Sequence, residues 1–333
     1  MPFNPYASFS MKDHVALITG GAQNIGEAIA RTFAAAGAKV MIADLNSEKA
    51  EATAKLIAAE TGQQVVGTRC DVTDDSQVKA CVAKTVVAFG GLTTLVNNVG
   101  WGQANPDPIA VTNEQMIESY KLNTLSALRM VEECAPFLRK SEYASITNSG
   151  SMVGIAPAFD FLAYSSAKAA LNHMMLGLAH LFAKQIRVNT VVIGTVLTEG
   201  YAAAGLDAKT QERLTNPDNL TGRSGTSQDV ANAFLWLASP AGSWVSGQTI
   251  QVAGGPKRVR LLPEDYRHLN EIFERNHGLE GKCDFVVKHP RFIVAIDRIL
   301  KASPKMSELK TDLQVTTVNV HDVAIGVLLI CAT

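Results

Sequence analysis

A phenol and an amine, Tyr164 and Lys168, stand four residues apart among small side chains in the stretch FLAYSSAKAALNHM. If this stretch is helical, the two side chains share one face, because positions i and i+4 are neighbours on a helix. A lysine ammonium close to a tyrosine favours the phenolate, which is the form that accepts a proton in general acid–base catalysis. Taken alone, the pair also fits an exposed tyrosine and lysine on a solvated helix.

A glycine-rich turn, TGGAQNIG at residues 19–26, follows an apolar strand-like run and precedes a helical pattern. Gly20, Gly21 and Gly26 would let a pyrophosphate approach the main chain, and the helix that follows offers free amides and the positive end of its dipole. This context favours a dinucleotide site over an ordinary tight turn.

Acidic residues follow the next two strand-like runs. Asp44 can accept both hydroxyls of an adenosine ribose and would repel a 2′-phosphate. The residue after it is Leu45, and Gln23 and Asn24 occupy the glycine turn, so no basic residue stands beside Asp44 in the sequence and NAD is favoured over NADP. Asp71, in CDVT, could accept from the adenine amino group, or it could cap the helix that follows.

The elements that must position these residues alternate regularly. Short apolar runs alternate with amphipathic patterns, which predicts a Rossmann-type α/β fold with a doubly wound parallel sheet. Ligands of such sheets bind at the carboxyl ends of the strands, where the residues above stand. The predicted strands are 15–19, 39–44, 64–70, 92–96, 144–148, 187–192 and 248–255, and the predicted helices are 24–37, 47–61, 74–89, 113–139, 162–183 and 227–238.

The pattern changes after Gly255. We therefore expect a dinucleotide-binding and catalytic domain at residues 1–255, followed by a C-terminal extension at residues 256–333. The extension contains the apolar stretches FVV, FIVAI and VAIGVLLIC, which would be aggregation-prone if exposed. We expect them to dock on their own or a neighbouring subunit, outside the catalytic pocket.

Bulk composition narrows the classes of partner and location. A net charge of -1 argues against nucleic acid or an acidic membrane as a partner, and no run of 18 apolar residues occurs. The five cysteines form no CxxC pair and have no metal-ligand spacing, which favours a reducing, cytoplasmic location and no metal site.

As an ordered set, the motifs TGGAQNIG, CDVT, NNVG, KLN, Ser151, YSSAK and RVNTVVIGTVLT resemble the classical short-chain dehydrogenase/reductase family over residues 12–255. The resemblance is nearest in character to bacterial hydroxysteroid dehydrogenases. It implies a proton-transferring tyrosine, a lysine that also binds the nicotinamide ribose, a serine that orients the substrate oxygen, and a helix asparagine that holds a water. These catalytic residues are Tyr164, Lys168, Ser151 and Asn123. The implied cofactor-binding residues are Gly20, Gln23, Asn24, Ile25, Gly26, Asp44, Leu45, Asp71, Val72, Asn98, Val99, Gly100, Tyr164, Lys168, Val196 and Thr198.

Three residues depart from the family pattern. Asn24 replaces a glycine, and asparagine tolerates positive φ better than most residues. Val99 replaces an alanine and adds bulk beside the cofactor. Ile193 replaces a proline and leaves φ less restrained.

The resemblance implies an NAD(H)-dependent oxidoreductase that interconverts a secondary alcohol and a ketone, with an apolar or alicyclic small-molecule substrate. Substrate walls are expected from residues 101–109, 152–161 and 199–222. The alternatives are a 3-oxoacyl thioester reductase and a catalytically idle dinucleotide-binding or scaffolding protein. Family members assemble through the helices at 113–139 and 162–183, which implies a homo-oligomer, a tetramer or a dimer.

Overall fold

The structure is a computed structural model, and it describes residues 4, 6–103, 110–156, 161–196, 198 and 219–255. Residues Met1–Gly255 form one compact unit of the chain. The expectation of a docked extension at 256–333 falls outside the described residues. So do 104–109, 157–160 and 199–218, which make up much of the expected substrate walls.

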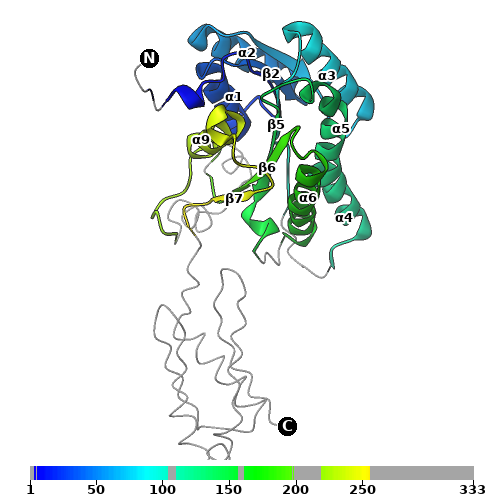
Figure 1. The fold of residues 1–333 in the computed structure, drawn as a ribbon. Coiled ribbons are helices and arrows are strands. Elements are labelled where there is room, and N and C mark those ends of the chain that lie inside the picture. Colours follow the sequence, from blue (N-terminus) through cyan, green and yellow to red (C-terminus); the bar gives the residue numbers. More distant parts are fainter. Residues whose placement is uncertain are drawn as a thin grey trace, which may run out of the picture. The chain divides into compact units, whose positions relative to one another are not determined.

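Seven parallel strands form one sheet in the order β3-β2-β1-β4-β5-β6-β7 (Figure 1). The predicted doubly wound sheet is therefore confirmed. The strand order reverses between β1 and β4, and ligands of such sheets bind at the crevice that this reversal opens. The strands are β1 (Val15–Thr19), β2 (Lys39–Asp44), β3 (Val65–Arg69), β4 (Thr94–Asn97), β5 (Ser145–Ser151), β6 (Arg187–Ile193) and β7 (Thr249–Val252).

Helices cover both faces of the sheet. The α-helices are α1 (Asn24–Ala35), α2 (Ser47–Thr61), α3 (Asp75–Phe89), α4 (Asn113–Tyr120), α5 (Ser126–Leu138), α6 (Leu162–Leu181) and α9 (Ser227–Ala238). Three short 3-10 turns, η1 (Ala7–Phe9), η4 (Met152–Gly154) and η6 (Pro240–Gly242), and a π-helical segment, η3 (Lys121–Leu125), complete the described elements.

Two hydrophobic cores result from this layering. Helices α3, α5 and α6 lie on one face of the sheet, and α1, α2 and α9 lie on the opposite face (Figure 1). Their buried side chains form one core on each face. The central strand β1 is buried along its whole length, because it contributes alternate side chains to both cores. This rigid centre fixes the carboxyl ends of β1, β4 and β5, where the candidate site lies.

The prediction of one continuous α-helix at 113–139 is wrong in the middle of that range. The π-helical segment η3 separates α4 from α5, and the Ser126 amide donates to the Lys121 carbonyl across the wider turn. Strand β5 is also longer than predicted, since it continues past Asn148 to Ser151. Its last three residues pair with β6 in the register Ser149↔Val191, Gly150↔Val192 and Ser151↔Ile193.

Candidate active site

Lys168 is buried beneath the candidate site, with 2% of its surface exposed. It projects from α6 toward the sheet, and its Nζ donates a hydrogen bond of 2.9 Å to the Ser149 carbonyl of β5. Burial lowers the pKa of this lysine from 10.5 to about 8, because the charged form loses hydration. An ammonium held this way is still mostly protonated at neutral pH, and it is fixed in position.

Tyr164 lies one helical turn before Lys168 on α6. The Lys168 Nζ is 5.7 Å from the centroid of the Tyr164 ring, and the Phe161 ring meets the same ring edge-on at 6.4 Å. The i, i+4 spacing therefore places the phenol and the ammonium on one face. The ammonium therefore lies over the face of the phenol ring.

Asn123 holds the main chain of the loop after β4. Its side-chain amide donates to the Trp101 carbonyl at 2.9 Å and accepts from the Trp101 amide at 3.0 Å. The same Nδ2 also lies 3.0 Å from the Ser119 carbonyl. The π-helical segment carries Asn123, which is 1% exposed, into this position. Asn123 therefore ties α4 to the loop beside Lys168.

Gly100 packs directly on two of the predicted catalytic residues. A Cβ placed there would lie 2.6 Å from the Lys168 Nζ and 3.0 Å from the Asn123 Oδ1. Only a glycine leaves room for both groups. The main chain that follows β4 therefore packs directly against Lys168 and Asn123.

Ser149 and Asn98 connect the strands beneath the site. The Ser149 hydroxyl donates to Asn98 Oδ1 at 2.9 Å, and Asn98 Nδ2 donates to the Gly20 carbonyl at 3.1 Å. Ser151, the last residue of β5, follows Ser149 on the same face of the strand, because side chains alternate. Ser151 thus lies at the carboxyl end of β5, and Lys168 binds the main chain of the same strand two residues earlier, at Ser149.

The glycine turn between β1 and α1 has the bare main chain that a pyrophosphate requires. A Cβ on Gly26 would overlap the Gly20 carbonyl oxygen and lie 2.8 Å from Asn98 Nδ2. Asn24, which replaces the family glycine, adopts φ 54°, so it takes the positive φ that the turn demands. The exposed Gln23 and the half-buried Ile25 flank it.

Asp44 is fixed at the end of β2 by two main-chain amides. Its Oδ2 accepts from the Ala22 amide at 3.1 Å, and its Oδ1 accepts from the Asn46 amide at 3.1 Å. Leu45 beside it is 61% exposed. The carboxylate thus bridges the glycine turn and the start of α2, where an adenosine ribose would lie.

A basic residue reaches the glycine turn in three dimensions, although none stands beside Asp44 in the sequence. Lys49, in the first turn of α2, donates from Nζ to Gln23 Oε1 at 2.6 Å. The turn from β2 into α2, capped by the Asn46 side chain at the Lys49 amide, brings this exposed cation to the site edge. A basic residue five positions after the strand-end acid is the signal that sequence reasoning missed.

Asp71 does not cap α3. The cap is Asp74, whose Oδ1 accepts from the amides of Ser76 and Gln77. Asp71 Oδ1 instead accepts from the amide and hydroxyl of Thr73, at 2.9 and 2.7 Å. Val72 beside it is buried. The carboxylate lies just beyond the end of β3, and its contact with an adenine stays a prediction.

The remaining predicted cofactor residues lie at other strand ends. Val99 packs its Cγ2 3.2 Å from the position of a Cβ on Gly20, so its extra bulk covers the glycine turn. Val196 is buried and forms a bridge with Gly225 beyond β6. Thr198 is half-buried two residues later.

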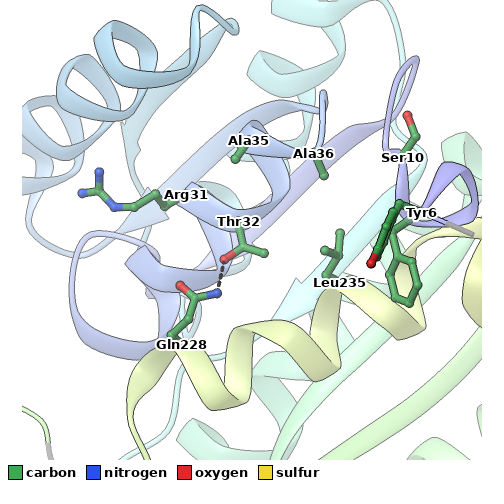
Figure 2. Close-up of a pocket in the computed structure, with 9 residues that line it drawn as sticks. Tyr6, Ser10, Arg31, Thr32, Ala35, Ala36, Gln228 and Leu235 are labelled. Carbon is green, nitrogen blue, oxygen red and sulfur yellow. Dashed lines mark hydrogen bonds between the residues drawn. The ribbon is translucent and has the colours of Figure 1, made fainter.

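A separate groove of about 570 Å³ lies on another part of the surface (Figure 2). It lies between α1, α9 and the N-terminal residues, and the Gln228 Nε2 donates to Thr32 Oγ1 at 3.0 Å in its wall. None of the predicted site residues lines it. The lining residues are Tyr6, Phe9, Ser10, Arg31, Thr32, Ala35, Ala36, Gln228 and Leu235.

Over the part of the chain that the structure describes, no three histidine, cysteine or acidic side chains gather as metal ligands. Within the same residues, no helix has the length and apolar character needed to cross a membrane.

Comparisons with known proteins agree with this geometry. The family model described as Enoyl-(Acyl carrier protein) reductase matches residues 20–257. The chain is 35% identical over 241 residues to the 7alpha-hydroxysteroid dehydrogenase of Escherichia coli strain K12, covering 72% of this chain and 92% of that protein.

Solved structures with the same fold include enzymes bound to either dinucleotide. A 7 alpha-hydroxysteroid dehydrogenase complexed with NADH and 7-oxo glycochenodeoxycholic acid superposes with a TM-score of 0.71 at 32% identity, covering 76% of this chain and 97% of that one. L-sorbose reductase from Gluconobacter frateurii, complexed with NADPH and L-sorbose, gives a TM-score of 0.69 at 27% identity, covering 74% and 98%. The fold, the strand-end residues and these similarities together show that the chain belongs to the short-chain dehydrogenase/reductase family of oxidoreductases.

Proposed function

We propose that the protein transfers a hydride between NAD(H) and a secondary alcohol or ketone with an apolar, alicyclic skeleton. The observation that carries this proposal is the buried ammonium of Lys168, held by the Ser149 carbonyl and set 5.7 Å from the Tyr164 ring. An idle dinucleotide-binding protein would have no use for a buried cation that costs stability. Proton transfer at the Tyr164 phenol would explain why a charged lysine is buried beside it.

In this mechanism the chain's own groups handle the proton and the substrate oxygen. Bound NAD(H) supplies or accepts the hydride at the reacting carbon. In the reducing direction, Tyr164 gives its hydroxyl proton to the oxygen that becomes the alcohol, and in the oxidising direction it takes that proton back. Lys168 favours the phenolate that is left, and Ser151 donates to the substrate oxygen.

The residues present fit a dinucleotide. The glycine turn leaves its main chain bare at Gly26, and α1 directs its free N-terminal amides to the same place. Two main-chain amides fix the Asp44 carboxylate. This position supports NAD over NADP, because the carboxylate would repel the 2′-phosphate of NADP. Lys49 stands near enough to weaken this preference, since its ammonium reaches the glycine turn.

The alicyclic substrate class is supported by the hydroxysteroid dehydrogenase relative. A second candidate is the reduction of a 3-oxoacyl thioester, because the matching family model is described as Enoyl-(Acyl carrier protein) reductase, a name that points to substrates carried as acyl thioesters. Both reactions use the same phenol and ammonium. They differ in the group that surrounds the reacting carbonyl.

We further propose that residues 1–255 hold the complete site and that residues 256–333 contribute stability or assembly without a catalytic group. The enzyme would act as a homo-oligomer in the cytoplasm. Support for a reducing compartment comes from Cys70, Cys81 and Cys134, which are free thiols in the core.

Steady-state kinetics with NADH and NADPH, on alicyclic ketones and on acetoacetyl thioesters, would test the proposal. Tyr164→Phe should lower turnover by about 10²–10⁴-fold, because it removes only the transferable proton, while NADH binding stays within about threefold. Retention of more than about a tenth of wild-type turnover would contradict the role of Tyr164. NADH binding without turnover of any ketone would support the idle protein instead.

A further inference from the structure

We propose that Gly102 is a positioning residue for Tyr164, and that the bare main chain at this residue sets the orientation of the proton-transferring phenol. This inference rests on the role proposed above for Tyr164. It adds a residue outside the expected catalytic and cofactor-binding sets, and it concerns the orientation of the ring.

The main chain of Gly102 lies directly against the root of the Tyr164 side chain. A Cβ placed on Gly102 would overlap the Tyr164 Cγ and lie 2.6 Å from its Cβ and 2.7 Å from its Cδ1. These atoms are not the far end of a flexible side chain, which could swing away at little cost. They follow directly from the backbone of α6, so relief requires a different χ1 or a moved loop. Side chains in a helix have few χ1 wells to choose from.

The loop that carries Gly102 is itself held firmly. Asn123 binds both the amide and the carbonyl of Trp101, one residue earlier, at 3.0 and 2.9 Å. Gly100, one residue before that, packs on the Lys168 Nζ. Three successive residues are therefore anchored to Lys168, Asn123 and Tyr164, so the loop cannot yield freely when a side chain is added.

The contact constrains the ring without covering its reactive end. Gly102 meets the Cβ, Cγ and Cδ1 atoms, which lie opposite the hydroxyl along the ring axis. The Phe161 ring meets the phenol edge-on, and the Lys168 Nζ lies 5.7 Å from its centroid. Gly102 thus limits the tilt of the ring at its root, and it leaves the hydroxyl end of the ring uncovered.

The test compares Gly102→Ala with Gly177→Ala in the full-length protein. Gly177 lies on α6 as well, and a Cβ there would meet nothing within 4 Å, so this control adds the same methyl group in open space. The readouts are kcat, KM, the pH dependence of kcat for alcohol oxidation, the dissociation constant for NADH, and the urea midpoint. Tyr164→Phe is measured in parallel.

We expect Gly102→Ala to lower kcat by about 10²-fold, since a displacement of about 1 Å at a reacting group has effects of this size. NADH binding should stay near the wild-type value, and the urea midpoint should fall modestly, because the added methyl group strains the folded state. As the phenol leaves the ammonium, its pKa should rise toward the ordinary value of about 10, so the acidic limb of the pH profile should move up by about half a pH unit or more. Gly177→Ala should match the wild type in kcat, KM, pH profile and NADH binding, and its urea midpoint should rise slightly, because alanine is a better helix former than glycine.

Three results would overturn the inference. Wild-type kcat in Gly102→Ala would show that the ring accommodates the methyl group. A lowered kcat with an unmoved pH profile would assign the effect to something other than the phenol. Joint loss of NADH binding and stability would make Gly102 a folding glycine. If Tyr164→Phe itself kept its activity, the proposed function would fail first, and that result is distinct from these three.

Discussion

Replacing Lys168 with methionine should remove activity and yet stabilise the protein at neutral pH. The pKa of Lys168 is lowered by burial from 10.5 to about 8. Each tenfold change in proton affinity corresponds to about 1.4 kcal/mol, so burial of the charged form costs about 3 kcal/mol at pH 7. Methionine leaves the Ser149 carbonyl without its donor, which costs about 1 kcal/mol. The expected net gain is about 2 kcal/mol.

The sign of this gain depends on pH. Between pH 8 and 10.5 the unfolded chain holds the Lys168 proton and the folded chain has released it, so wild-type stability rises with pH over this interval. Above the interval the lysine is neutral in both states and the penalty is gone. The difference in free energy of unfolding between Lys168→Met and the wild type should therefore fall by about 3 kcal/mol from pH 7 to pH 10.5.

Urea unfolding at several pH values measures this difference directly. Lys79→Met is the matched control, because Lys79 is an exposed lysine on α3, and its effect should be small at every pH. A difference for Lys168→Met that did not change with pH would refute the argument that a buried charge is the cause. Lower stability of the variant at pH 7 would refute the calculated size of the penalty.

Two further predictions concern the cofactor. Asp44→Ala combined with Leu45→Arg should shift the ratio of kcat/KM values toward NADPH by about tenfold or more, since a repulsive carboxylate is replaced by a phosphate partner; a wild type that already prefers NADPH would contradict the Asp44 argument. Gly26→Ala should abolish NADH binding, because the new methyl group would overlap the Gly20 carbonyl in the glycine turn. Gly91→Ala, where a Cβ meets nothing within 4 Å, should bind NADH as the wild type does in a fluorescence titration. Equal binding by both alanine variants would refute the role of the bare turn.

The order of the elements was determined by the sequence itself. Alternating apolar runs and amphipathic patterns depend on interactions within a few residues, so strands such as Val15–Thr19 and helices such as Ser47–Thr61 could be predicted to the residue. The pairing of Tyr164 with Lys168 follows from helical geometry alone. The positive φ of Asn24 follows from the steric demands of its turn.

Contacts between distant segments were decided only by the tertiary structure. Asn123 holds Trp101 because a π-helical segment interrupts the predicted helix, and no local pattern indicates such a segment. Lys49 reaches Gln23 only after α2 turns back toward the glycine turn. Gly102 packs on Tyr164, which lies 62 residues further along the sequence, from 102 to 164. Even the lowered pKa of Lys168 depends on the whole core, because burial is the sum of contributions from every element packed around it.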